Sequence, residues 1–147
     1  AEGKAIIFAE EEVRAIGRAG QGVIGIKLKK GDYVVGMDKL SKGTDVLTVS
    51  ENGFGKRTPT SEFRPQGRGG LGIINMKVTE KTGKVVGIKI VNPEQELLLI
   101  TTEGLVIRTD ISSISVVGRN AQGVILMRTK DDDKIAALAT VTLKTDQ

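Results

Sequence analysis

A Gly-Arg motif that recurs three times constrains the fold of this chain more than any other feature of its sequence. Each copy consists of Gly-Arg, three variable residues, a second glycine and then Val or Ile. The copies begin at Gly17, Gly67 and Gly118, so they are 50 and 51 residues apart. A period of this size predicts an array of similar structural units. We therefore divide the chain, as a single domain, into three repeats at about residues 1–44, 45–94 and 95–147.

Within each repeat the sequence is typical of short β-strands. The apolar runs are rich in Val, Ile, Leu and Thr and are bounded by glycine or charged residues. The clearest of them are Asp45 to Ser50, Val85 to Val91, Gln95 to Thr101 and Val124 to Arg128. Gly53 and Gly104 each lie between two runs, as in hairpin turns. Only Glu10 to Ile16 and Ile111 to Val116 have helical character. The pattern predicts an all-β fold with about four strands per repeat, the size of a propeller blade.

The composition excludes several classes of catalytic site. The chain has no cysteine and no histidine, which removes disulfides, thiolate nucleophiles, the commonest general base and the usual zinc ligands. The acidic run Asp131 to Asp133 lacks the further spaced ligands of a calcium loop. Tyr33 is the only tyrosine and has no accompanying arginine cluster. We therefore expect no catalytic residue, no metal site and no cofactor.

The charge of the chain indicates a class of partner without identifying it. The net charge is +4 and the pI is about 9.4, which fits an anionic partner but does not demonstrate one. No apolar run approaches the roughly 20 residues that a membrane-spanning helix needs. We therefore do not expect a membrane partner.

Five segments carry a resemblance to a known family. They are Val13 to Gly17, Glu51 to Thr58, Ser61 to Phe63, Gln66 to Gly72 and Ile114 to Leu126. These segments resemble the blade sequences of the C-terminal domain of the gyrase A protein, most of all those of its last three blades. The resemblance implies a β-pinwheel, a six-bladed disc in which neighbouring blades exchange strands. Three repeats amount to half of such a disc.

The same resemblance implies a function. The DNA gyrase A domain bends double-stranded DNA around a basic rim without reading its sequence, and so supports supercoiling by an ATP-dependent type II topoisomerase. The implied partners are DNA and the remainder of the gyrase A and gyrase B subunits, in the bacterial cytoplasm at the nucleoid. The domain itself is not catalytic. The family's box reads Gln-Arg-Arg-Gly-Gly-Lys-Gly, and here Gly67 and Leu71 replace an Arg and the Lys. Gln66 to Gly72 is therefore a box-like element of an internal blade.

Loops rich in glycine and arginine suit contact with DNA phosphates. Glycine lets main-chain N–H groups approach a phosphate closely, and arginine adds a bidentate charged contact. If every repeat presents its motif at the same edge, the motif arginines lie along one arc. The candidate DNA-contacting residues are Arg18, Lys56, Arg57, Arg64, Gln66, Arg68, Gly69, Gly70, Arg108 and Arg119.

Other functions fit the same sequence. The repeats also suit a propeller-type scaffold for protein interactions, in which carboxylates such as Glu62 and Asp110 pair with the arginines. The C-terminal domain of topoisomerase IV has similar blades. An enzyme acting on a phosphate ligand fits least, because the chain has no Walker spacing and no evident general base.

The edges of the repeat array raise a separate expectation. The first repeat starts at its second predicted strand, just after Gly3, and half a disc has two open β edges. Open edges readily pair with another chain. We therefore expect either that two copies associate through these edges and form a homodimer, or that the C-terminal strand fills the gap.

Overall fold

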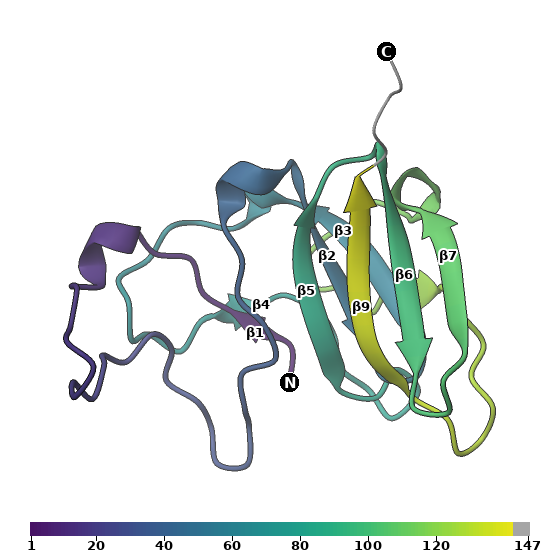
Figure 1. Ribbon diagram of the computed structural model, residues 1–147, viewed down its shortest axis with the longest axis horizontal. Helices are drawn as coiled ribbons and strands as arrows, with labels where there is room; N and C mark the ends of the chain where they lie inside the picture. Colours follow the sequence, from purple (N-terminus) through teal and green to yellow (C-terminus); the bar gives the residue numbers. More distant parts are fainter. Residues whose placement is uncertain (143–147) are drawn as a thin grey trace.

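The chain folds into nine short β-strands, which the computed structural model describes for residues 1–142 (Figure 1). The strands are β1 (Lys4–Ala5), β2 (Asp45–Ser50), β3 (Phe54–Pro59), β4 (Ile73–Ile74), β5 (Val85–Val91), β6 (Gln95–Thr101), β7 (Val106–Asp110), β8 (Val124–Ile125) and β9 (Ile135–Thr142). Four 3₁₀ turns lie between them: η1 (Glu10–Glu12), η2 (Leu40–Lys42), η3 (Thr60–Glu62) and η4 (Ile111–Ser113). This part of the chain contains no α-helix, and no helix in it could cross a membrane. The predicted all-β class is confirmed.

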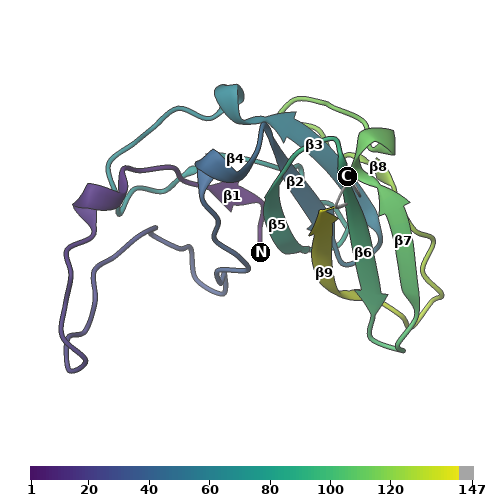
Figure 2. The same ribbon diagram turned by 45° about the horizontal axis from the view of Figure 1, so that its top comes forward.

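The strands form three antiparallel sheets with the orders β1-β4, β5-β2-β3-β8 and β7-β6-β9. Two strand pairs join different repeats. Strand β4 of the second repeat pairs with β1 of the first, and β8 of the third repeat extends the sheet of the second. Neighbouring repeats therefore exchange strands, as expected for a β-pinwheel. In Figure 2 the first repeat, coloured purple and blue, extends as long loops to one side of the two larger sheets.

The hairpin turns lie where the sequence predicts them. Gly53 connects β2 to β3 with a φ of 85°, and Gly104 connects β6 to β7 with a φ of 86°. This left-handed conformation is accessible to glycine without steric cost. The Gly53 N–H donates to the carbonyl oxygen of Ser50 at 3.1 Å, and the Gly104 N–H donates to that of Thr101 at 3.0 Å. The turns thus fix the register of both hairpins.

Three of the predicted strands, β2, β5 and β6, have the expected bounds, whereas other segments are shorter. The run from Val124 pairs only at its first two residues, because the next two N–H groups both turn to the carbonyl oxygen of Gly53, at 2.8 and 3.3 Å. The two segments with helical character form only the 3₁₀ turns η1 and η4. Tyr33, the only tyrosine, lies outside the assigned strands.

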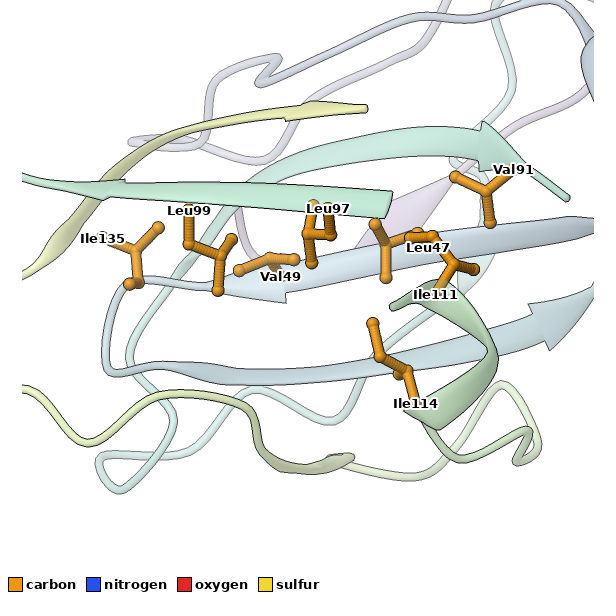
Figure 3. Close-up of a cluster of buried hydrophobic side chains, with 8 residues drawn as sticks. All are labelled: Leu47, Val49, Val91, Leu97, Leu99, Ile111, Ile114 and Ile135. Atoms are coloured by element: carbon orange, nitrogen blue, oxygen red, sulfur yellow. The ribbon is translucent and has the colours of Figure 1, made fainter. Parts of the chain in front are cut away.

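The main apolar core lies between the second and third repeats. It contains Leu47, Val49, Val91, Leu97, Leu99, Ile111, Ile114 and Ile135 (Figure 3). Every residue of β2 is buried, and full burial of an aliphatic side chain stabilises a fold by about 1.5–3 kcal/mol. The contact between the first and second repeats consists of two smaller clusters, with Val46, Phe63 and Ile90 buried in one and Phe54, Met76 and Val85 in the other. The second and third repeats therefore form the better packed part of the described chain.

Gly53 lies close to the main chain of the third repeat. A Cβ atom added at Gly53 would be 2.0 Å from the carbonyl oxygen of Met127, whereas one added at Gly104 would meet nothing within 4 Å. The two glycines occupy the same position in consecutive repeats and have nearly the same φ. Comparing the two positions therefore distinguishes the strain of the turn, which both share, from the contact between repeats, which only Gly53 makes.

We expect Gly53→Ala to destabilise the protein much more than Gly104→Ala. Both substitutions carry the strain of a left-handed alanine, about 1–2 kcal/mol. Only Gly53→Ala must also displace the main chain at Met127 and disturb the β3–β8 pair, for a total loss of about 3–4 kcal/mol. Urea unfolding of the two variants measures the difference. Equal losses would show that this close contact does not hold the third repeat in place.

Candidate nucleic-acid interface

Each Gly-Arg motif forms a turn at the same place in its repeat. The Gly20 N–H donates to the carbonyl oxygen of Gly17 at 2.9 Å, and the Ala121 N–H donates to that of Gly118 at 3.2 Å. In all three motifs the arginine is the first residue of the turn. The 3₁₀ turns η1, η3 and η4 precede the three motifs at matching positions. Local structure thus repeats together with the sequence.

Two motif arginines donate hydrogen bonds to the main chain of the preceding repeat. Nη1 of Arg119 donates to the carbonyl oxygen of Ile74 at 3.0 Å. Nη1 of Arg68 donates to the carbonyl oxygen of Ile24 at 3.0 Å, and Nε of Arg68 donates to that of Glu12 at 3.1 Å. Both arginines are partly exposed, so each guanidinium also presents N–H groups that are not used in these bonds.

Three further candidate arginines lie on the surface. Arg18 and Arg64 are exposed, and their side chains make no hydrogen bond or ion pair within residues 1–142. Arg108 is exposed on β7 and forms an ion pair with Glu96 of the neighbouring strand β6. This pairing reduces the positive potential around Arg108.

The main chain of the second motif is bonded to the first repeat. The Gln66 N–H donates to the carbonyl oxygen of Ile7 at 2.7 Å, and the Gly69 N–H donates to that of Gly25 at 2.6 Å. The carbonyl oxygen of Gly70 accepts from the N–H of Lys27 at 2.8 Å. These groups are engaged within the protein, so the geometry favours side chains over main-chain N–H groups as contacts for phosphate.

Lys56 does not lie on the surface. It is buried, and its Nζ donates to the carbonyl oxygens of Gly118 at 2.7 Å and Arg119 at 2.9 Å. Burial lowers the pKa of Lys56 to about 8, with the nearby Glu62 carboxylate opposing the shift and Arg119 adding to it. Lys56 therefore holds the main chain of the third motif through these two hydrogen bonds, and it is not one of the proposed DNA contacts.

Arg57 is also buried, with an exposed fraction of 7%. Its Nη1 lies 3.2 Å from Oδ2 of Asp45. Its Nε donates to the carbonyl oxygen of Ile114 at 2.9 Å, and its Nη2 donates to that of Ser112 at 3.3 Å. Removing one partner of a buried ion pair typically costs about 3–5 kcal/mol. Arg57 thus links the second and third repeats, and we remove it from the proposed contacts as well.

Sequence reasoning named Glu62 among the carboxylates that could pair with the arginines, but it did not find Glu12 or the position of such a carboxylate beside the motif of the next repeat. Oε1 of Glu12 accepts a hydrogen bond of 3.0 Å from the main-chain N–H of Arg68. Glu62, at the same position in the next repeat, lies near Gly118, where Oε1 would be 3.6 Å from an added Cβ atom. Their recurrence, each the last residue of its 3₁₀ turn, is the signal that could have predicted this. Each of these carboxylates lowers the positive potential at the motif of the next repeat.

Comparison with known proteins decides the family of this array of exchanged repeats. The family model of the DNA gyrase C-terminal domain, a beta-propeller, matches residues 1–41, 44–92 and 95–142. The chain belongs to the DNA gyrase A C-terminal domain family. The DNA gyrase A protein of Deinococcus deserti is 48% identical over 138 residues, and that of Escherichia coli K12 is 43% identical over 147 residues. These matches cover 90% and 100% of this chain but only 17% of each relative.

Solved structures support the same assignment. A structure of a DNA gyrase A C-terminal domain superposes with a TM-score of 0.89 at 34% identity, covering 95% of this chain and 47% of the other. The C-terminal domain of a DNA topoisomerase IV superposes with a TM-score of 0.86 at 21% identity, covering 96% of this chain and 44% of the other. The second match shows a shared fold.

In this gyrase A family chain we expect the contribution of Lys56 to stability to depend on pH. Its pKa is about 8 in the folded protein, compared with 10.5 for an ordinary lysine. Between these values the unfolded chain binds more protons, so the free energy of unfolding rises with pH from about 8 to about 10.5. At lower pH Lys56 is charged in both states and adds no slope. Lys56→Met should lack the rise.

Urea unfolding of wild type and Lys56→Met at about pH 7 and about pH 10 measures this difference. Lys77→Met is the control, because Lys77 is exposed and its removal should leave the rise intact. Identical pH dependence in wild type and Lys56→Met would contradict the lowered pKa of Lys56.

Proposed function

We propose that this chain binds double-stranded DNA without base preference and bends it, as a non-catalytic part of a gyrase A protein. In that role it works with the remainder of gyrase A and with gyrase B in ATP-dependent supercoiling, at the nucleoid in the bacterial cytoplasm. One observation carries the proposal. The Gly-Arg motif recurs at the same place in each repeat of an array that belongs to the gyrase A C-terminal domain family. Repetition of one cationic element suits a regular backbone and not a unique ligand.

The proposed contacts are the cationic and polar side chains at the surface. Arg18 and Arg64 are exposed, and Arg68 and Arg119 retain N–H groups beyond those bonded to the main chain. Gln66 is a secondary contact beside Arg68, and Gly70 allows the backbone of a nucleic acid to approach the turn. Arg108 contributes only if phosphate displaces Glu96. This set makes no base-specific demand, so binding should depend on charge.

The decisive measurement is a topology assay. Protein is bound to relaxed circular DNA, the DNA is relaxed again with a type I enzyme, and the linking number is scored after the protein is removed. We expect a protein-dependent shift in linking number. With six to ten phosphate contacts, affinity should fall by about 10³–10⁵ between about 50 and 200 mM salt. Neither a shift nor retardation of linear DNA at low salt would leave the protein-interaction scaffold as the better interpretation.

We expect Arg64→Gln to reduce the slope of log K against log salt by about 0.9, because one phosphate contact is lost. The affinity should fall to a similar extent for unrelated DNA sequences. Lys29→Gln removes one positive charge from an exposed turn of the first repeat and serves as the control. We expect its salt slope to match that of wild type. An unchanged slope for Arg64→Gln would exclude Arg64 from the contacts.

The predicted homodimer would form through the two end repeats of the array. Added Cβ atoms at Gly22 and Gly104 meet nothing within 4 Å, whereas the matching positions Gly72 and Gly53 lie against the main chain of a neighbouring repeat. Within residues 1–142, Gly22 therefore lacks the contact with a preceding repeat and Gly104 lacks the contact with a following one, so each edge offers what the other lacks. We expect sedimentation velocity to show a concentration-dependent dimer, and Gly104→Lys to weaken it. A monomer at high concentration would contradict this prediction.

A further inference from the structure

We infer that the motif arginines Arg68 and Arg119 are positioning residues, each of which links its blade to the preceding one. Arg68 of the second repeat donates to the carbonyl oxygen of Ile24 in the first, and Arg119 of the third donates to that of Ile74 in the second, both at 3.0 Å. Ile24 and Ile74 occupy the same place in their repeats, two residues after the last glycine of the motif. One contact between different repeats therefore occurs twice.

Arg18 provides a comparison within the same molecule. It is the arginine of the first motif, and residues 1–142 contain no repeat ahead of it. Its side chain is exposed and makes no hydrogen bond in this part of the chain. If the arginine bonded within its own repeat, Arg18 would show the same bond as Arg68 and Arg119. The bond thus depends on a preceding blade.

The arginine contact belongs to a set of main-chain bonds that also recurs. At the first junction, between repeats one and two, the Lys27 N–H donates to the carbonyl oxygen of Gly70 at 2.8 Å. At the second junction, between repeats two and three, the Lys77 N–H donates to that of Ala121 at 3.2 Å. At each junction the guanidinium of the motif arginine, Arg68 or Arg119, adds a side-chain hydrogen bond to these main-chain bonds. A charged donor on a carbonyl is stronger than a neutral one, so the arginine is expected to hold the turn in register.

A second recurring bond lies on the other side of each motif. The Gln66 N–H donates to the carbonyl oxygen of Ile7 at 2.7 Å, and the Val117 N–H donates to that of Arg57 at 2.8 Å. The motif turn is therefore held at both ends by the preceding repeat, with the arginine between them. Loss of the guanidinium should loosen these two bonds at its own junction and leave the other junction unchanged.

These arginines are inferred to do more than supply positive charge. The effect of this positioning on DNA rests on the proposed function. A cation that only neutralises phosphate leaves the angle between blades free. An arginine bonded to the previous blade fixes where successive cations lie. The DNA path would then be set by these inter-repeat bonds, while Arg18 and Arg64 supply charge without positioning anything in residues 1–142.

Amide hydrogen exchange of Arg119→Gln and Arg68→Gln tests the inference without DNA. In Arg119→Gln we expect the amides of Lys77 and Val117 to exchange about tenfold faster, as for loss of a hydrogen bond to a charged group. Those of Lys27 and Gln66 should keep the wild-type rate. In Arg68→Gln the effect should move to Lys27 and Gln66. Each variant is thus the control for the other.

Acceleration spread evenly over both junctions, or none at either, would overturn the inference. A DNA measurement then separates positioning from direct contact. If Arg119 positions the blade besides contacting phosphate, Arg119→Gln gives a smaller linking-number change per bound protein than Arg64→Gln, although each variant loses about 0.9 from the slope of log K against log salt. A slope reduced by about 0.9 with unchanged exchange would make Arg119 a phosphate contact only. Absence of DNA binding by wild type would remove the proposed function, while hydrogen exchange would still decide the role of the arginine.

Discussion

The exchange of strands between consecutive repeats is the interaction on which the rest of the structure depends. Strands β4 and β8 are only two residues long and could not persist as isolated hairpins. Each gains its hydrogen bonds by pairing with the preceding repeat, at β1 and at β3. The glycine turns, the motif turns and the buried side chains are all arranged around these short pairs. The blades are therefore neither separable domains nor a continuous sheet.

Burial of two cations follows from this arrangement. The segment from Ser112 to Arg119, which leads into the third motif, lies along β3 of the second repeat and covers Lys56 and Arg57. Their donors are satisfied by main-chain oxygens and by Asp45, which limits the cost of burying charge. At the first junction the corresponding residues are Ile6 and Ile7. The two junctions thus share the same main-chain hydrogen bonds but differ in these two side chains, which are apolar at the first junction and charged at the second.

The sequence predicts the repeat, the fold class and the longest strands, because these depend on local patterns. Strands β2 and β6 are apolar runs bounded by turns, and their bounds could be read directly. The fate of Lys56 and Arg57 could not, because a charged residue in a basic strand is normally solvated. Nor could the partners of Arg68 and Arg119, since a main-chain carbonyl has no signature in the sequence. The candidate site was therefore predicted by motif, while its division into contact and support required the three-dimensional structure.

The recurrence of one junction also bears on how such arrays change in length. Each repeat offers a donor side, with its motif arginine, and an acceptor side, with its turn glycine and carbonyl groups. Because every unit carries both sides, duplication or loss of a whole unit leaves every remaining joint intact. Insertion of part of a unit breaks one. An array of this kind can therefore evolve only in whole steps, and with each step the circumference it offers to a partner grows or shrinks by one fixed increment.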